Sequence, residues 1–331
     1  MTTTVGLDIG GTKINGGVVD SDGNVIARAR RETPAQDADL IAHEAADIIR
    51  ELSHGRDVVA AGVACAGFID KSGATVLFAP NLAWRDEPLK QRLESIVDIP
   101  VIIENDANAA AWGEFTHGVG RDADDMVLVT VGTGIGGGVI VDSRLLRGAW
   151  GVAAELGHLR VVPDGIRCGC GNRGCWEQYA SGNALVREAR DVVVSGTPMA
   201  ARLAQLCGND ASALRGHDVT RAAKEGDPAA LELLTDLGTW LGEGAASVVA
   251  LLDPELIVIG GGVADAGDLL LEPTRAAFRR QLTGRGHRPE AEFALASLGN
   301  DAGMIGAAAL AAEGIGGNGN GNGNSGGGFS A

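Results

Sequence analysis

The chain has 331 residues, of which 45% are hydrophobic and 21% are charged, and its formal net charge at pH 7 is −16. This length exceeds the usual size of one domain, so we expect two lobes that each have a hydrophobic core. The negative charge excludes nucleic acid and anionic membranes as main partners, because both would repel the chain at long range. The sequence contains no apolar run of the roughly 20 residues needed to span a bilayer, and its first residues, MTTTVGLDIGGTK, lack the charged and apolar regions typical of a signal peptide. We therefore expect a cytoplasmic protein.

Short β-branched runs alternate with helical patterns along the chain, which is typical of α/β folds. Strands are predicted at Thr4–Ile9, Val58–Val63, Val101–Glu104, Met126–Val131, Gly138–Val141 and Leu256–Ile259. A helix is predicted over 37–52, where the apolar residues share one face, and another over Pro228–Leu252, which Asp253 and Pro254 end. Residues 315–331 are nearly all Gly, Asn and Ser, so they cannot bury apolar area and are predicted to form a disordered tail.

Two glycine-rich segments of the chain resemble one another. Asp8–Asp20 aligns without gaps to Thr130–Asp142, with four identities and the same apolar positions. Chance similarity of two glycine-rich hairpins is one interpretation. The other, which we favour, is a duplicated αβ lobe in which each half presents a phosphate-binding hairpin, because glycine exposes backbone N–H groups that no side chain covers.

The run GTGIGG (132–137) also matches the dinucleotide-binding pattern G-x-G-x-x-G. That pattern requires a helix directly after the turn, and a strand is predicted here instead, which excludes a Rossmann nucleotide site. A third strand-to-glycine junction, 256–265, precedes a helix predicted near Asp268. This junction is either an ordinary tight turn or a place where a flat ring or a phosphate approaches the backbone.

Three polar residues, Glu104, Asn105 and Asp106, follow a buried strand and precede an Ala-rich helix. Ligands of open α/β sheets bind outside the carboxyl ends of strands. Asp106 can cap the helix, and it can also accept a proton from a sugar hydroxyl as that oxygen attacks a γ-phosphate. The two roles do not exclude each other.

Three of the five cysteines lie close together, with the spacing Cys168-x-Cys170-x4-Cys175. A structural zinc site needs four ligands. The candidates for the fourth are Cys65, Cys207 and the six histidines, of which His158 is nearest upstream. A redox thiol cluster is the weaker interpretation because the sequence has no C-x-x-C motif.

Five motifs in order, DIGGTK, ENDANAA, GTGIGGG, ELGH and CGCGNRGCWE, resemble the ROK family of bacterial sugar kinases and related repressors. The resemblance runs from about Gly6 to Ala312 and is greatest to the ATP-dependent, glucose-phosphorylating members of actinobacteria. It implies a two-lobed actin/hexokinase-like (ribonuclease H-like) α/β fold with a duplicated αβ core and an active site in the interlobe cleft. The small lobe would comprise 1–110 and 301–314, and the large lobe 111–300 with a zinc-binding loop.

The resemblance also implies an activity: ATP-dependent phosphorylation of D-glucose to glucose 6-phosphate, with Mg²⁺ and a structural zinc ion, in a homodimer or homotetramer. Its implied partners are the hexose and Mg-ATP, without nucleic acid or membrane. Asp106 would be the general base, and the sugar would be held by Gly67, Asn81, Asn105, Asp106, Glu155, His158 and Glu177. Phosphates would be held by Asp8, Gly10, Gly11, Thr12, Lys13, Gly132, Thr133 and Gly134, and the adenosine would be bordered by Gly260, Gly261 and Gly262. Zinc would be held by His158, Cys168, Cys170 and Cys175.

The chain departs from the family at Ala154, where members commonly have glycine, and the added methyl would tighten the sugar pocket.

Three other functions compete with glucose phosphorylation. The chain could phosphorylate another hexose, such as fructose, mannose or N-acetylmannosamine. A sugar-responsive regulator would need a helix-turn-helix ahead of the phosphate loop, and only seven residues precede Asp8. A zinc-stabilised sugar-binding module without catalysis is disfavoured by Asp106 and the two hairpins.

Overall fold

The computed structural model describes residues 2–317. Backbone contacts divide these residues into two compact units, the first formed by 2–106 with 304–317 and the second by 107–303. The chain passes between the units at the start of helix α3 (Asp106–His117) and in the first turn of helix α10 (Ala302–Gly317). The sequence analysis placed these two boundaries after residues 110 and 300.

The predicted tail starts too early. Residues 315–317 form the end of α10, because a helix continues through its own backbone hydrogen bonds even where its side chains have little to pack against. The remaining part of the predicted tail, 318–331, lies outside the described residues.

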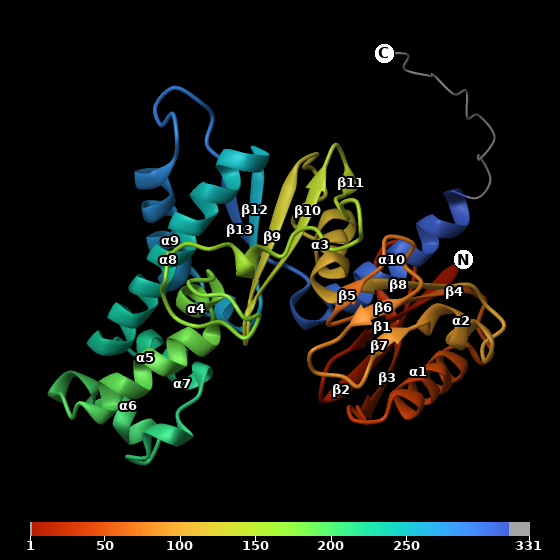
Figure 1. The fold of residues 1–331 in the computed structure, drawn as a ribbon, viewed down its shortest axis with the longest axis horizontal. Helices are drawn as coiled ribbons and strands as arrows, with labels where there is room; N and C mark the ends of the chain where they lie inside the picture. The colour runs from red at the N-terminus through yellow and green to blue at the C-terminus, as the bar shows by residue number, and fades with distance from the viewer. Residues whose placement is uncertain (1, 318–331) are drawn as a thin grey trace. The chain divides into compact units, whose positions relative to one another are not determined.

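The first unit contains a five-stranded sheet in the order β3-β2-β1-β4-β8 (Figure 1). The strands β1 (Thr3–Ile9), β2 (Lys13–Val19) and β3 (Val25–Glu32) pair antiparallel, whereas β4 (Val58–Cys65) and β8 (Val101–Asn105) run parallel to β1. A small antiparallel sheet is formed by β5 (Phe68–Ile69), β6 (Val76–Phe78) and β7 (Arg85–Glu87). Helices α1 (Ala38–Ser53) and α2 (Leu89–Glu94) complete this unit with α10.

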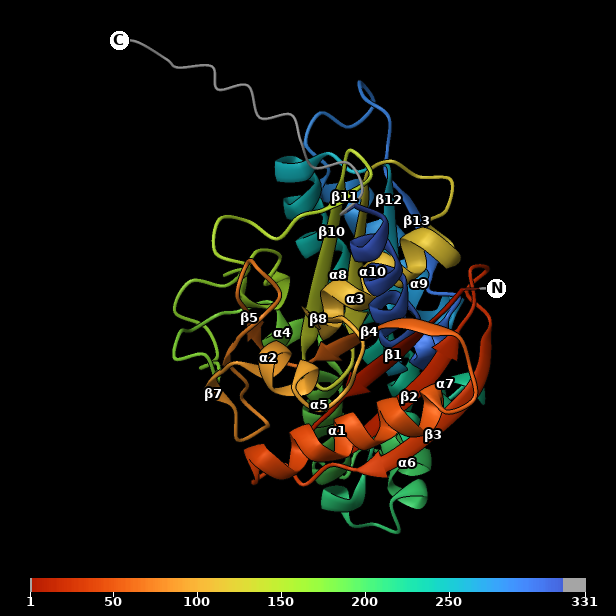
Figure 2. The same ribbon diagram turned by 90° about the vertical axis from the view of Figure 1, so that its right-hand side faces the viewer.

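Helices α1 and α10 cover opposite faces of the first sheet. Figures 1 and 2 both show α1 alongside β2 and β3. A methyl group added at Gly16 would meet Ile48 of α1 at 2.6 Å, and one added at Gly62 would meet the backbone oxygen of Ala307 in α10 at 1.8 Å. These glycines therefore let the helices lie directly against the strands. Helix α1 begins at Asp37, whose side chain accepts a hydrogen bond from the N–H of Leu40.

The second unit repeats this architecture with the strand order β11-β10-β9-β12-β13. The strands are β9 (Met126–Val131), β10 (Ile135–Val141), β11 (Arg144–Leu145), β12 (Leu256–Gly260) and β13 (Glu292–Leu295). Here too the first three strands in the chain pair antiparallel and the last two join in parallel. The strand ends Ile9 and Val131, and the strand starts Lys13 and Ile135, are equivalent in the gapless alignment. This agreement favours duplication over chance similarity of two hairpins.

Two helical layers enclose the second sheet. Helix α3 lies against one face, where a methyl group added at Gly138 would be 2.4 Å from the side chain of Ala111. The other face buries Val127, Val129 and Val131 in a core shared with α8 (Pro228–Leu252) and α9 (Asp268–Gln281), which lie side by side in Figure 1. The remaining α-helices of this unit are α4 (Glu177–Ala180), α5 (Gly182–Val194), α6 (Ala201–Leu206) and α7 (Gly216–Lys224).

Helix α8 has both predicted ends. The side chain of Asp227 caps its start by accepting a hydrogen bond from the N–H of Ala230, and Asp253 ends it in a left-handed conformation with φ of 48°.

Within residues 2–317, we find no helix that combines the length and the apolar character needed to cross a membrane.

Replacing Gly62 with alanine tests the contact between β4 and α10. The new methyl group would displace the α10 backbone, so we expect the free energy of unfolding in urea to fall by about 2 kcal/mol or more. Gly216→Ala is the matched control, because the nearest atom, in Val186, would be 3.8 Å away. An unchanged urea midpoint for Gly62→Ala would contradict the close packing.

Candidate functional site

The predicted polar residues of the first unit gather at the carboxyl ends of parallel strands. Asp8 precedes the end of β1, and Asp106 follows β8 as the first residue of α3. The amide of Asn105 donates to the backbone oxygen of Gly67 at 3.1 Å, which places these two predicted sugar residues together. Burial, and then the negative charge of Asp106, raise the pKa of Asp8 from 3.8 to about 6. The edge of the sheet therefore brings two interacting carboxyl groups together.

The first glycine-rich turn connects β1 and β2. The N–H of Gly10 donates to the backbone oxygen of Lys13 at 3.0 Å, and the hydroxyl of Thr33 donates to the oxygen of Gly10 at 2.7 Å. A methyl group added at Gly11 would be 3.3 Å from the Cβ of Asn81. The predicted phosphate turn and the predicted sugar residue Asn81 are thus neighbours.

The second glycine-rich turn, Gly132–Gly134, opens onto a cavity of about 610 Å³. The N–H of Gly132 donates to the oxygen of Gly134 at 3.0 Å, which closes the turn. The start of α5 lies against it, with the N–H of Gly182 donating to the oxygen of Gly132 at 2.8 Å. The cavity is also lined by three arginines, Arg187, Arg190 and Arg215. Arg187 is paired with Glu188 at 3.0 Å, and Arg190 and Arg215 both donate to the backbone oxygen of Leu214, so the protein itself engages these groups too. The bare backbone turn beside them suits a phosphate group.

The cysteine motif and His158 form one cluster in the second unit. Their ligand atoms all lie within 4.8 Å of one another. The distance from Cys168 Sγ to His158 Nδ1 is 3.7 Å, and that from Cys170 Sγ to Cys175 Sγ is 3.6 Å. Among the candidates for a fourth ligand, the structure therefore selects His158. Three sulfur atoms and one imidazole nitrogen are a donor set that fits zinc.

Tight turns between the cysteines bring them together. The N–H of Gly171 donates to the oxygen of Cys168, and the N–H of Cys168 donates to the oxygen of Asn172. Gly171 and Gly174 have positive φ angles of 96° and 76°, which favour glycine. Burial, and then a hydrogen bond with Glu177, raise the pKa of the Cys168 thiol to about 12 in the protein without a metal ion. A bound cation would oppose this shift because it stabilises the thiolate.

Glu177 connects this cluster to the second glycine turn. Its Oε1 is 2.9 Å from Cys168 Sγ and 3.8 Å from His158 Nδ1. A methyl group added at Gly134 would be 2.6 Å from Glu177 Oε2. The absence of a side chain at residue 134 therefore leaves room for this carboxylate.

Trp176 is a positioning residue that the sequence analysis missed. It is fully buried beside Glu177, and its indole N–H donates to the oxygen of Trp240 at 2.8 Å. A methyl group added at Gly244 of α8 would be 2.1 Å from the Trp176 ring. The glycines in α8 were visible in the sequence, but nothing there indicated which ring they face.

Glu155 and His158 begin and end a short turn that follows Ala154. The N–H of Leu156 donates to the oxygen of Ala154 at 2.7 Å, and the N–H of His158 donates to the oxygen of Glu155 at 3.0 Å. Ala154 has a φ of 66°, in the left-handed region that favours glycine. Its side chain packs against the core of the second unit. The glycine common in the family thus matches a backbone requirement.

The third glycine junction, Gly260–Gly262, follows β12 at the same edge of the sheet as the second turn. A methyl group added at Gly261 would be 2.5 Å from the backbone oxygen of Val131, the last residue of β9. The two turns are therefore adjacent. A 3-10 helix, η4 (Gly262–Ala266), separates this junction from α9, which begins at Asp268 as predicted.

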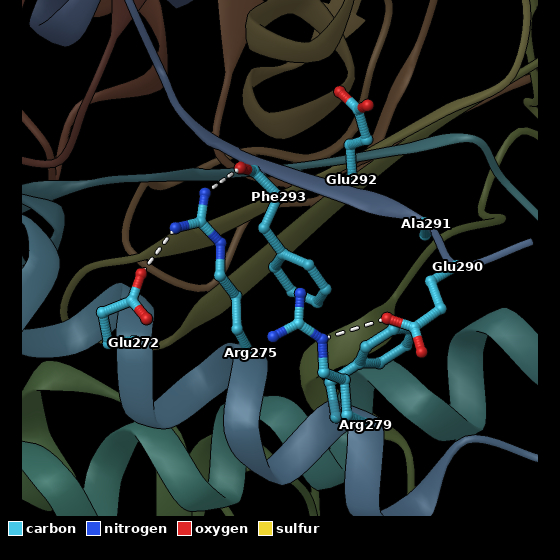
Figure 3. Close-up of a pocket in the computed structure, with 8 residues that line it drawn as sticks. Glu272, Arg275, Arg279, Glu290, Ala291, Glu292 and Phe293 are labelled. Atoms are coloured by element: carbon cyan, nitrogen blue, oxygen red, sulfur yellow. Dashed lines mark hydrogen bonds and ion pairs between the residues drawn. The ribbon is translucent and has the colours of Figure 1, made fainter. Parts of the chain in front are cut away.

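A further cavity of about 350 Å³ lies between α9 and β13 (Figure 3). Arg275 donates to Glu272 and to the backbone oxygen of Phe293, both at 2.7 Å, and Arg279 donates to Glu290 at 3.0 Å. The cationic groups of this cavity are thus engaged by the protein itself. Its lining includes none of the predicted site residues.

The paired sheets, the glycine turns and the cysteine cluster define an actin/hexokinase-like protein. The model of the ROK family matches residues 4–314, so the chain belongs to this family.

Several relatives cover nearly the whole chain. The glucokinase of Streptomyces coelicolor is 45% identical over 313 residues, which cover 95% of this chain and 98% of that protein. The crystal structure of a ROK family glucokinase from Streptomyces griseus in complex with glucose and AMPPNP is 48% identical. It superposes with a TM-score of 0.85 and covers 94% of this chain and 99% of that one. A ROK hexokinase from Thermus thermophilus is 35% identical, has a TM-score of 0.78, and covers 95% of this chain and 99% of that one.

The raised pKa of Asp8 predicts a pH-dependent stability. The pKa of Asp8 in the folded protein, about 6, exceeds the ordinary value of 3.8. Protonated Asp8 therefore makes its full contribution to the free energy of unfolding below about pH 3.8, and this contribution is lost as the pH rises through 6. Asp8→Asn removes this effect. From pH 4 to pH 7.5 we expect the unfolding free energy of the variant, relative to wild type, to increase by about 2 kcal/mol. Urea unfolding at both pH values measures it.

Asp22→Asn, in an exposed turn, is the control for this comparison. A difference between Asp8→Asn and wild type that stays the same at pH 4 and pH 7.5 would mean that Asp8 does not titrate as inferred.

The cysteine cluster predicts about one zinc ion per purified chain. Cys170→Ser removes one of four ligands, so its zinc content and melting temperature should both fall. Elemental analysis and thermal unfolding measure these effects. Cys207→Ser is the matched control, because Cys207 donates to the oxygen of Ala204 at the end of α6, outside the cluster. Full zinc content in Cys170→Ser would show that the ion lies elsewhere.

Proposed function

We propose that this protein transfers the γ-phosphoryl group of Mg-ATP to the 6-hydroxyl of D-glucose. The observation that carries the proposal is the similarity to a glucokinase along nearly the full length of both chains. The site supports it, because the carboxylates and glycine turns of the described residues suit phosphoryl transfer and the His/Cys cluster can order the loop before Glu177. Phosphoryl transfer depends chiefly on positioning and on stabilisation of negative charge.

In the first unit, Asp106 is the proposed general base. Its position at the carboxyl end of β8 is where ligands of such sheets bind, and its carboxylate accepts the proton of the attacking hydroxyl. Asn105 would bind a sugar hydroxyl, and its amide is already oriented by the hydrogen bond to Gly67. Gly67 and Asn81 would contribute further sugar contacts. Asp8 and the turn Gly10–Lys13 would bind the phosphate chain with its Mg²⁺.

In the second unit, Glu155, His158 and Glu177 are proposed to bind sugar hydroxyls. A carboxylate accepts two charge-assisted hydrogen bonds from neighbouring hydroxyls. Zinc, held by His158, Cys168, Cys170 and Cys175, would fix the ring of His158 and the loop before Glu177. Because Nδ1 of His158 faces Cys168, Nε2 remains for the sugar.

The nucleotide is proposed to bind along the two adjacent glycine turns of the second unit. Gly132, Thr133 and Gly134 would donate backbone N–H groups to the phosphates, and Gly260, Gly261 and Gly262 would border the adenosine. Mg²⁺, when bound, supplies positive charge that offsets the charge developing on the phosphoryl oxygens. Oxygen ligands suit this ion, and the carboxyl group of Asp8 would provide one. The homodimer or homotetramer and the cytoplasmic location expected from the sequence stay predictions.

Coupled measurement of ADP release tests the reaction. We expect faster release with D-glucose than with fructose, mannose or N-acetylmannosamine. Asp106→Asn keeps the size of the side chain and removes the proton acceptor, so kcat should fall by about 10²–10⁴-fold while glucose still binds.

Two outcomes would overturn parts of this account separately. Faster ADP release with another hexose than with glucose rejects the substrate and keeps the reaction. A kcat for Asp106→Asn within about threefold of wild type rejects Asp106 as the base.

A further inference from the structure

Helix α3 contains a buried carboxylate that the proposed mechanism does not use. Glu114 is fully buried and lies outside the residues assigned to the site. Its Oε1 accepts a hydrogen bond from the N–H of Leu298 at 2.7 Å, and its Oε2 accepts from the hydroxyl of Ser297 at 3.0 Å and from the N–H of Val119 at 3.1 Å. Burying a carboxylate is costly unless hydrogen bonds replace its water. Three donors do so here.

The three donors connect two segments of the second unit. Val119 follows the end of α3, and the other two donors lie between β13 and η5 (Gly299–Asp301), shortly before the chain enters α10. A methyl group added at Gly118 would be 2.0 Å from Glu114 Oε2, so the turn after α3 leaves room for the carboxylate. Glu114 therefore fastens the helix through which the chain enters the second unit to the segment through which it leaves.

The contact of α3 with β10 leaves the position of the helix along its axis weakly defined. A methyl group added at Gly136 would be 3.0 Å from the side chain of Ala107, and one added at Gly138 would be 2.4 Å from that of Ala111. These small residues fix the distance between helix and strand, but sliding is prevented by side chains that interdigitate. Hydrogen bonds depend strongly on distance and direction, so those of Glu114 supply the missing restraint.

We propose that Glu114 is a positioning residue for Asp106. This inference rests on the proposed function, which makes Asp106 the general base. Asp106 begins α3, eight residues or about 12 Å before Glu114, and the hydrogen-bonded backbone of the helix transmits a displacement from one end to the other. A misplacement of about 1 Å can cost about 100-fold in rate. The hydrogen bonds of Glu114 thus keep the carboxylate of Asp106 within reach of the attacking hydroxyl.

Glu114→Gln and Ser297→Ala release this anchor in two steps. Whichever way the amide of Glu114→Gln lies, its NH₂ group faces a backbone N–H, that of Leu298 or that of Val119, and one hydrogen bond becomes a repulsion. We expect kcat to fall about tenfold or more, while the Kd for glucose stays within about twofold of wild type. Ser297→Ala removes one donor of three, so its kcat should fall by less. Coupled ADP release and calorimetry with glucose measure these effects.

A double variant separates positioning from a general loss of stability. In the Asp106→Asn background, Glu114→Gln should lower kcat no further, because no base is left to misplace. Thr116→Val is the matched control in the same helix. The hydroxyl of Thr116 donates to the backbone oxygen of Trp112 at 2.7 Å, so its loss weakens α3 without releasing the helix from residues 297–298. Its kcat should stay near that of wild type even if its melting temperature falls.

Three results would overturn the role of Glu114. They are a kcat for Glu114→Gln within about twofold of wild type, an equal loss of kcat in Thr116→Val, and a further loss when Glu114→Gln is added to Asp106→Asn. If Glu114→Gln does not fold, Ser297→Ala decides, because its kcat must then fall below that of Thr116→Val. A normal kcat for Asp106→Asn would instead reject the proposed base, whereas a normal kcat for Glu114→Gln beside an impaired Asp106→Asn rejects the positioning role alone.

Discussion

The site of the second unit depends on glycines that leave room for larger side chains, because a methyl group added at Gly134 would lie 2.6 Å from the carboxylate of Glu177 and displace it. Glu177 also meets the cysteine cluster at Cys168, and the neighbouring Trp176 is buried and donates a hydrogen bond to the backbone oxygen of Trp240. A side chain at Gly134 would move Glu177, and a side chain at Gly244 would move Trp176, with the same consequence for the site. The geometry of the second unit's site thus depends on missing side chains as much as on the polar groups that are present.

Charge sets a second requirement. A chain with a net charge of −16 repels a polyphosphate at long range, so its binding needs cationic groups close to the phosphate turn. The cavity at Gly132 has Arg187, Arg190 and Arg215 in its lining. In the first unit two carboxyl groups interact instead, which the raised pKa of Asp8 reflects. This part of the first unit suits a cation, and the two units therefore differ in charge although their sheets share one topology.

Local patterns in the sequence were enough to predict much of this protein. β-Branched runs located β1, β4, β9 and β12, and the residues Asp253 and Pro254 located the end of α8. The cysteine spacing located three members of the cluster, whereas the fourth, His158, was indicated by the family resemblance. Each of these signals lies within a few residues of the feature that it indicates.

Features that depend on tertiary contacts were not predictable in this way. Strand β3 alternates exposed and partly buried residues at a sheet edge, and α6 has only six residues, a length at which packing rather than sequence stabilises a helix. The contact of Trp176 with Gly244 and the hydrogen bonds of Glu114 with residues 297 and 298 join residues that are far apart in the chain. The helical residues 315–317 carry a tail-like composition, yet they form the end of α10.

Ala154 has a consequence for how freely the loop that carries Glu155 and His158 moves. An alanine in the left-handed region costs about 1–2 kcal/mol more than a glycine would. The same methyl group removes many of the conformations that glycine would sample when the loop opens. A loop with fewer open states loses less conformational entropy when it closes on a ligand. Because alanine disfavours this conformation, the packing of Ala154 on the core of the second unit has to offset the strain and keep Glu155 and His158 in one arrangement, and glycine at this position would need less of that packing energy.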